Sequence, residues 1–103
     1  MLLIREVMHC KPGKVRALVE MFLKMSKIGE KIGMGRMRVL TDFSGERYWT
    51  LVAEMEAPSL DAFEKMMAGD GKHEKEMKEM ESIMKGYHDL VDHGRREIFR
   101  IEG

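Results

Sequence analysis

The chain has 103 residues, of which 44% are hydrophobic and 35% charged, and its 18 basic side chains balance 18 acidic ones. This length fits a single domain covering residues 1–103. A net charge of zero without a basic cluster argues against a nucleic-acid or anionic-membrane partner, because both favour clustered Lys and Arg. The one cysteine, Cys10, excludes an intramolecular disulfide and a multi-cysteine metal site.

Two features of composition bear on source and location. Charge appears early, at Arg5 and Glu6, so the N-terminus predicts neither a signal peptide nor a membrane span, and we expect a cytoplasmic location. The chain contains no Asn and no Gln, which together with its high charge is a thermophile trend, although codon bias produces the same pattern. A melting temperature below about 55 °C, an ordinary mesophile value, would count against a warm-growing source.

The first predicted element is a strand from Leu2 to Cys10. Both of its alternating faces carry apolar side chains, which predicts burial on both sides toward one end. Lys11-Pro12-Gly13 ends the strand, and from Lys14 onward apolar residues recur at steps of three and four, as far as Ile32. This spacing predicts an amphipathic helix of about five turns, which the glycines of Gly33-Met34-Gly35 terminate.

Two further strands, Arg36 to Phe43 and Glu46 to Glu56, are predicted around a hairpin turn at Ser44-Gly45. A two-residue loop would place Asp42 opposite Arg47, Leu40 opposite Trp49 and Thr41 opposite Tyr48. Each of these pairs is chemically sensible, so we expect this register.

The remaining chain predicts two helices and a final strand. Ser59 is a suitable N-cap for a helix from Leu60 to Ala68. After the loop Gly69-Asp70-Gly71, Asp70 is a candidate cap for a second helix, from Lys72 to about Gly86. Residues 90–94 would then connect to a strand from Arg95 to Ile101.

The order β–α–β–β–α–α–β predicts an α+β domain with a ferredoxin-like, four-stranded antiparallel sheet and helices on one face. The other face must carry apolar side chains, and the candidates are Leu2, Ile4, Val39, Val52 and Ile98 or their alternates. Because an exposed apolar face marks an association site, we expect a homodimer that packs sheet against sheet.

The sequence resembles the dimeric α+β barrel superfamily, particularly its antibiotic-biosynthesis-monooxygenase-like and NIPSNAP-like members. The likeness covers nearly the whole chain and is carried by the segments Lys11-Pro12-Gly13-Lys14, Asp42-Phe43-Ser44-Gly45, Trp49 to Glu56, Ser59 to Glu64 and Gly94 to Phe99. It implies a pocket between sheet and helices and a dimer formed through the sheets. Members include cofactor-independent oxygenases of aromatic polyketides, heme-degrading oxygenases and isomerases. Heme-degrading members use an Asn, and this chain has none, so we expect no heme and no other cofactor.

Five residues are candidates for the site. His73 shares a helical stripe with Met77, so it would face the sheet as a base or heme ligand, or else form a local hydrogen bond at the helix start. Trp49 would form the wall for a flat aromatic ligand, or would be a core or interface aromatic. In a regular strand Tyr48 points the other way, so both could not line one cavity. Arg38, if it points inward, would bind an anionic or carbonyl group, and otherwise belongs to an ion pair at the interface rim. His9 ends the first strand.

Metal binding is not expected. His88 and His93 lack convincing spacing, and no HExxH motif is present. The methionines at 66, 67, 77, 80 and 84 allow a copper(I) hypothesis, but Met also fills irregular cores, and a Met-lined cavity for an apolar ligand fits better.

Two functions follow. One is a pocket protein for a small aromatic or apolar molecule, with cofactor-independent monooxygenase activity, in which His73 is catalytic and Trp49, Arg38, His9 and Met77 bind the ligand. The other is a non-catalytic homodimer with a sensing or structural role. A cavity of a few hundred Å³ with His73 or His9 in its wall would favour the enzyme.

Overall fold

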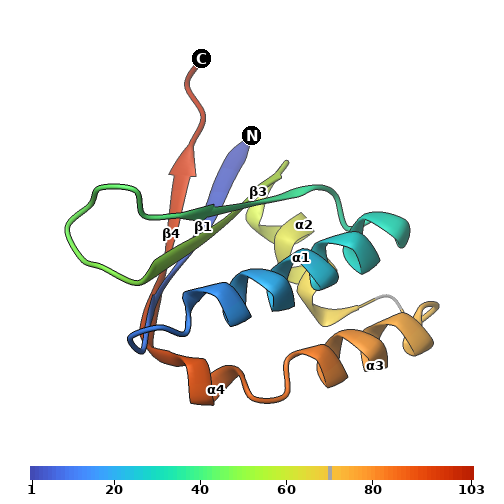
Figure 1. Cartoon of the computed structure of the whole chain (residues 1–103). Coiled ribbons are helices and arrows are strands. Elements are labelled where there is room, and N and C mark those ends of the chain that lie inside the picture. The colour runs from blue at the N-terminus through green and yellow to red at the C-terminus, as the bar shows by residue number, and fades with distance from the viewer. Residues whose placement is uncertain (70) are drawn as a thin grey trace.

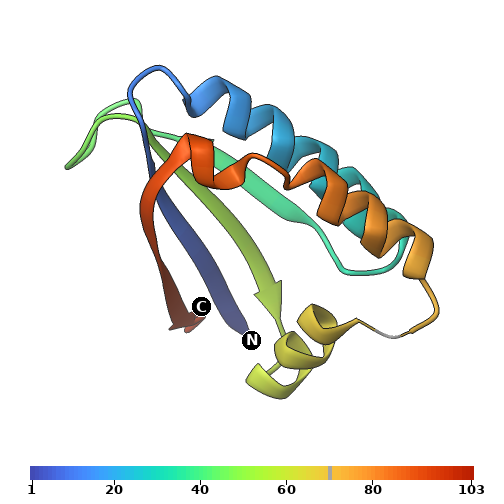
Figure 2. The same cartoon turned by 90° about the horizontal axis from the view of Figure 1, so that it is seen from below.

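The chain folds into two layers, a sheet and a set of helices that cover one side of it (Figures 1 and 2). The computed structural model describes residues 1–69 and 71–103. The elements are β1 (Leu2–Cys10), α1 (Val15–Lys31), β2 (Met37–Thr41), β3 (Thr50–Ala57), α2 (Leu60–Ala68), α3 (Glu74–Ile83), α4 (Tyr87–Leu90) and β4 (Val91–Arg100). The predicted cap Asp70 lies outside the described residues.

The sheet has the strand order β2-β3-β1-β4, and all its neighbouring pairs are antiparallel. Helices α1 and α3 lie side by side across it, and α2 lies at the end of β3 (Figure 2). The predicted α+β, ferredoxin-like arrangement is therefore confirmed. The short helix α4 is an addition, because Gly86 takes a φ of 87° and separates it from α3.

Several helix and strand boundaries agree with those predicted from the sequence. β1 and α2 have the predicted bounds, and Ser59 Oγ accepts a hydrogen bond from the Ala62 N–H at 3.1 Å, which confirms the N-cap. The last strand was predicted too short. It starts at Val91 because the ladder with β1 continues as far as the Cys10–Val91 pair.

The predicted two-residue hairpin is wrong. Leu40 pairs with Val52 and Thr41 with Leu51, so residues 42–49 form a wide loop instead of strand. The reason is that Asp42 Oδ1 accepts a hydrogen bond from the Thr50 N–H at 2.8 Å and closes the loop early. Trp49, at the end of this loop, has a φ of 59°, a left-handed conformation that interrupts an extended strand.

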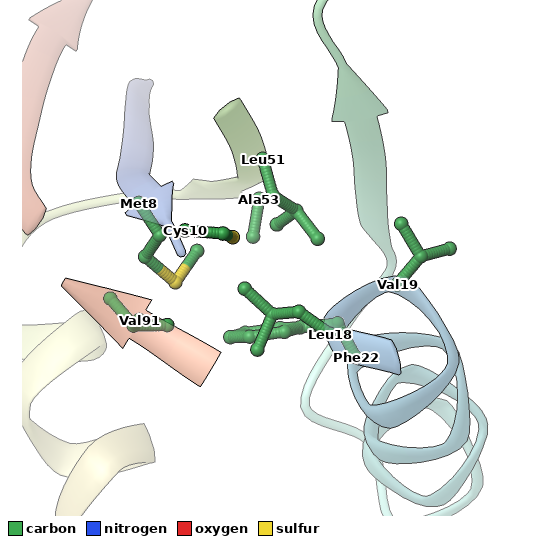
Figure 3. Close-up of a cluster of buried hydrophobic side chains, with 8 residues drawn as sticks. All are labelled: Met8, Cys10, Leu18, Val19, Phe22, Leu51, Ala53 and Val91. Atoms are coloured by element: carbon green, nitrogen blue, oxygen red, sulfur yellow. The ribbon is translucent and has the colours of Figure 1, made fainter. Parts of the chain in front are cut away.

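The hydrophobic core lies between the sheet and α1, where alternate residues of β1 and β3 face the helices. Side chains from β1, α1, β3 and β4 meet in the larger cluster (Figure 3): Met8, Cys10, Leu18, Val19, Phe22, Leu51, Ala53 and Val91. A second cluster, at the α2 end, contains Ile4, Ala57 and Phe63. These contacts fix which face of the sheet is inside.

We call the other side of the sheet the open face, and no described helix covers it (Figure 2). Of the apolar residues proposed for this face, Val52 lies on it, whereas Leu2, Ile4 and Val39 pack against the interior clusters. Ile98 is paired with Ile4 and so lies on the helix side as well. The alternate residues Leu3, Val7, Leu40 and Phe99 are on the open face instead, as the strand registers require.

Candidate functional site

A cavity of about 230 Å³ lies between the sheet and the helices. Its wall is contributed by β1, β2 and β3 below and by α1, α2 and α3 above. Two small residues leave the space, since Ala53 on β3 and the buried Gly29 on α1 present little side chain there. The cavity is therefore formed where the helix layer does not fully fill the gap above the sheet.

Methionine dominates the wall of this cavity, which we call the methionine cavity. Among the described residues, seven methionines line it: Met25, Met34, Met37, Met55, Met67, Met77 and Met80. Met77, predicted as a ligand-binding residue, is one of them. Long, unbranched thioether side chains change rotamer at little cost, so such a wall adapts to apolar guests of different shape.

Two polar side chains, Glu6 and Ser26, also reach the wall. Glu6 Oε1 accepts a hydrogen bond from Arg96 Nε, and the Arg96 guanidinium in turn lies 5.0 Å from the centre of the Phe63 ring. Ser26 Oγ donates to the carbonyl of Met37 at 3.5 Å. Glu6 is thus a carboxylate held by a cation at the edge of an apolar space.

Tyr87 of α4 lies near this carboxylate, and the two residues line a hollow of about 400 Å³. Burial, helped by the negative charge of Glu6 and by Cys10, raises the pKa of the Tyr87 hydroxyl above its usual value. The phenol therefore stays protonated at neutral pH. The sequence prediction missed Glu6 as a site residue, although a signal was present, since it is the one charge in the even series of β1 between Ile4 and Met8.

His73 lies beside this cavity and outside its lining. It occupies the N-cap position of α3, is half-buried, and lines a neighbouring hollow of about 270 Å³. The two spaces share Met34 and Met77. His73 and Met77 are therefore brought to adjacent spaces, but neither His73 nor His9 is among the described residues that line the methionine cavity.

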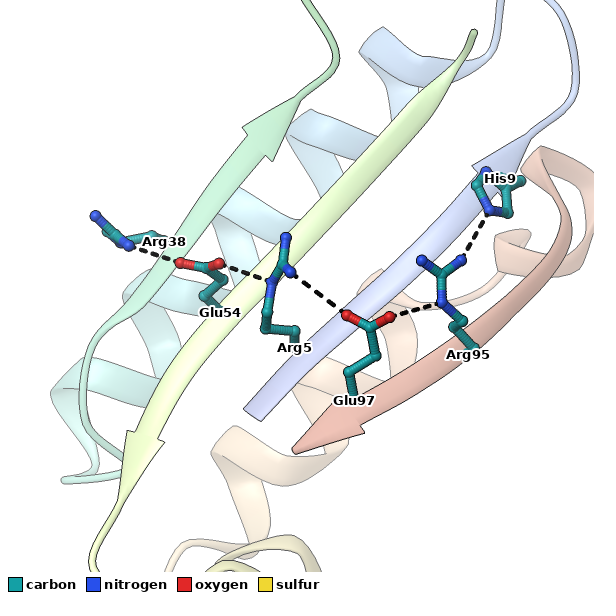
Figure 4. Close-up of polar contacts among 6 residues, drawn as sticks. All are labelled: Arg5, His9, Arg38, Glu54, Arg95 and Glu97. Carbon is teal, nitrogen blue, oxygen red and sulfur yellow. Dashed lines mark hydrogen bonds and ion pairs between the residues drawn. The ribbon is translucent and has the colours of Figure 1, made fainter. Parts of the chain in front are cut away.

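Arg38 and His9 lie on the open face, on the far side of the sheet from the cavity. Both belong to a chain of polar contacts that crosses all four strands, in which positive and negative side chains alternate and the last member is an imidazole. We call it the charged ladder (Figure 4): Arg38, Glu54, Arg5, Glu97, Arg95 and His9. Successive polar atoms lie 2.6, 2.9, 3.4, 2.9 and 3.2 Å apart along it. Glu54 is its most buried member, with 8% of its surface exposed.

Trp49 lies at a third place, in the loop of residues 42–49. It lines a shallow hollow of about 550 Å³ together with Tyr48, Asp42 and Arg16. The expectation that Tyr48 and Trp49 could not share a cavity was wrong, because it assumed a regular strand where the chain forms a loop. The five predicted site residues are consequently distributed over three separate regions.

Metal sites and membrane spans can be assessed within residues 1–69 and 71–103. No group of three or more His, Cys, Asp and Glu side chains there could hold a metal ion. In the same part of the chain, no helix is long and apolar enough to cross a membrane.

Comparison with known proteins gives a likeness in structure only. No protein-family model and no curated protein sequence matches the chain. An uncharacterized NIPSNAP domain protein from Burkholderia xenovorans superposes with a TM-score of 0.76 at 14% identity, covering 100% of this chain and 96% of the other. A NIPSNAP family protein from Agrobacterium tumefaciens gives 0.77 at 10% identity, with 96% and 90% covered.

An antibiotic biosynthesis monooxygenase has the same fold, with a TM-score of 0.71 at 10% identity and 100% of both chains covered. At identities this low, the likeness establishes the fold, and any activity has to be argued from the residues of the site. The strand order, the helix-covered face and these neighbours together show that the chain has the same α+β, ferredoxin-like fold as these NIPSNAP and antibiotic biosynthesis monooxygenase proteins.

Proposed function

We propose that this protein binds a small, mainly apolar molecule in the methionine cavity. The observation that carries the proposal is a space of about 230 Å³ between the sheet and the helices, partly open to solvent, with a wall that is almost entirely hydrophobic. An apolar cavity of roughly 150 Å³ already holds benzene, so this one suits a molecule of one or two fused rings. Thioether sulfurs contact aromatic rings favourably, by about 0.3–1.5 kcal/mol each, which favours an aromatic guest.

Glu6 supports a more specific ligand class, an aromatic molecule that carries a hydroxyl group. A carboxylate only accepts hydrogen bonds when ionised, and Arg96 holds one of its oxygens. A hydroxyl on the guest could donate to this carboxylate, and a hydrogen bond to a charged group is worth about 1.5–3 kcal/mol. The guest would thereby be oriented by one polar contact within an apolar wall.

Binding can be tested with naphthol and naphthalene as probes, using naphthol fluorescence and the rise in melting temperature. We expect naphthol to bind more tightly than naphthalene by roughly tenfold or more, and Glu6→Gln to remove most of this preference. Gly29→Leu would fill the cavity and abolish binding. Gly29→Ala is the matched control, since its added Cβ would meet Met34 only at an ordinary 3.7 Å. Unchanged binding to Gly29→Leu, or no binding to the wild type, would contradict the proposal.

A second candidate is cofactor-independent oxygenation of the bound molecule. The placement of Glu6 beside the cavity favours it, because a base next to a phenolic guest could remove the proton that precedes reaction with oxygen. Oxygen uptake with naphthohydroquinone, measured above its spontaneous oxidation, tests this. Loss of activity in Glu6→Gln with activity kept in His73→Ala would identify the base as Glu6. The reverse pattern would support His73, the residue predicted from the sequence, and no uptake above background would reject the activity.

We also infer that two copies associate through their open faces. In the single chain, 49% of the Phe99 surface is exposed there, beside its register partner Leu3. Leu40 and Val52 lie on the same face, on the other side of the charged ladder. Phe99→Glu should therefore shift sedimentation at micromolar concentration from dimer to monomer. Leu60→Glu, a change of equal character at a side chain that is 52% exposed on α2, is the control and should leave the dimer intact. A wild-type monomer under these conditions would refute the inference.

A further inference from the structure

Two histidines face each other at one end of the open face. His9 of β1 and His93 of β4 are paired in the strand register, and the centres of their rings lie 4.9 Å apart. Each ring contacts an arginine through Nε2. Arg95 Nη1 lies 3.2 Å from His9 Nε2, and Arg47 Nη1 lies 2.9 Å from His93 Nε2.

These contacts determine where the imidazole protons are. A guanidinium group only donates hydrogen bonds, so each Nε2 atom must accept through its lone pair and carry no proton. The proton is then on Nδ1 of each ring. Nδ1 of His9 donates to Thr50 Oγ1 and Nδ1 of His93 donates to Asp92 Oδ2, both at 3.1 Å. Both rings are therefore neutral in this arrangement.

Charged groups of both signs surround the two histidines. The positive groups are Arg5 from β1, Arg95 from β4 and Arg47 from the loop of residues 42–49. The titratable His88 of α4 lines a hollow together with His93. The negative groups are Glu54 from β3, Asp92 and Glu97 from β4, and Asp42 and Glu46 from the loop. Glu54 and Glu97 already pair with Arg5, and Glu97 also pairs with Arg95. Burial, followed by Arg47, His93 and Arg95, lowers the pKa of His9 below its ordinary 6.5, and only Glu46 opposes this.

Arg47 connects this pair to the loop of residues 42–49. Its contact with His93 joins the middle of the loop to β4, across the open face. The loop is also held at its two ends, by Thr50 N–H to Asp42 Oδ1 at 2.8 Å and by Cys10 N–H to the Trp49 carbonyl at 2.8 Å. Neither of these bonds involves an imidazole.

We propose that His9 and His93 form a pH-dependent contact with the arginines. This contact holds the middle of the loop to the sheet while both rings are neutral and releases it when they are protonated. A proton on Nε2 removes the acceptor that each arginine uses and places two positive groups in contact. The ends of the loop stay attached, so the fold persists. The hollow of Tyr48 and Trp49, which this loop builds, changes shape with pH.

The proposal can be tested by NMR on the whole ¹⁵N-labelled protein between about pH 8 and about pH 5. At the upper limit, imidazole ¹⁵N shifts should identify both rings as the Nδ1-protonated tautomer. On acidification, backbone relaxation of residues 43–48 should show increased fast motion, with a midpoint below 6.5 for the His9 signal, while sheet amides distant from His9 and His93 keep their shifts. An Nε2-protonated tautomer, or a loop equally rigid at both limits, would overturn it.

Variants distinguish this pH-dependent contact from the effect of low pH on the rest of the protein. The double variant His9→Gln/His93→Gln should abolish the pH response of the loop, since Gln can accept a hydrogen bond and does not titrate. Arg47→Ala should mobilise the loop already at about pH 8. His88→Gln, at an exposed position on α4, is the matched control and should titrate like the wild type. Should the double variant still show the acid response, or Arg47→Ala leave the loop rigid, the assignment is wrong.

Discussion

Replacing Glu54 by glutamine would remove one of the two negative charges of the charged ladder. The carboxylate of Glu54 lies between two guanidinium groups, 2.9 Å from Arg5 Nε and 2.6 Å from Arg38 Nη2. The amide of the Glu54→Gln variant would keep one oxygen that can accept a hydrogen bond, but it would leave two positive groups facing a neutral side chain. The fold should therefore become less stable.

The magnitude depends on how well water screens each pair. Removing one partner of a fully buried ion pair costs about 3–5 kcal/mol, whereas an exposed pair contributes at most about 1 kcal/mol. The Glu54 side chain is 9% exposed, that of Arg5 is 32% exposed and that of Arg38 is 73% exposed. Arg38 is thus largely hydrated and Arg5 only partly, which gives an expected loss of about 1–2 kcal/mol. For a domain of this size the melting temperature should fall by roughly 4–16 °C.

Urea unfolding followed by circular dichroism measures this loss, with Glu56→Gln as the matched control. Glu56 is two residues further along β3 on the same face and is exposed, so its substitution should change stability by less than about 0.5 kcal/mol. Unfolding should be recorded at two protein concentrations, because a sheet-to-sheet dimer would add a concentration-dependent contribution. The reasoning is refuted if Glu54→Gln unfolds at the same urea concentration as Glu56→Gln.

Three further predictions concern β4, His9 and Cys10. A Cβ added at Gly94 would lie 2.9 Å from the carbonyl oxygen of Val7, so Gly94→Ala should destabilise the fold by about 1–3 kcal/mol. Gly45→Ala, the control, should leave stability unchanged. Equal melting temperatures for the two variants would show that the backbone near Gly94 can move to accept the Cβ. The pKa of His9 is below 6.5 in the folded chain, so the unfolded chain binds more protons as the pH falls under that value. The free energy of unfolding should therefore be at its full value above pH 6.5 and decrease below it. In His9→Gln this decrease should be smaller. Burial raises the pKa of the Cys10 thiol, so a thiol reagent should label the native protein far more slowly than the urea-unfolded one, and equal rates would contradict this burial.

The sequence predicts the fold well where periodicity decides it. The partial alternation in residues 2–10 and the spacing of apolar residues in α1 reflect packing between the sheet and the helix that covers it. The Ser59 cap is a local hydrogen bond that depends on few neighbours. The hairpin failed because cross-strand pairs of sensible chemistry exist in more than one register. The actual register depends on Asp42 capping Thr50, a contact that alternation does not reveal.

The site was harder to predict because it depends on which face of the sheet is inside. His9, Arg38 and Trp49 were chosen as residue types suited to chemistry, but the first two lie on the open face and the third in the loop. Met77 was predicted from its helical stripe and does line the cavity. Glu6 was overlooked because a single charge within a strand identifies a site only when its apolar neighbours Ile4 and Met8 are known to face the helices.

The methionine cavity has a consequence for how much of the protein stays folded in its cell. An unfilled, enclosed apolar space destabilises a protein interior by about 24 cal/mol per Å³, which sets an upper limit of about 5.5 kcal/mol for 230 Å³; this cavity is partly open to solvent and costs less. Even part of that upper limit is a large fraction of the folding free energy of a small domain, which is about 5–15 kcal/mol. A guest would thus complete the hydrophobic core as a missing side chain would. The amount of intact protein would rise and fall with the supply of the guest, because unoccupied copies unfold and are degraded sooner.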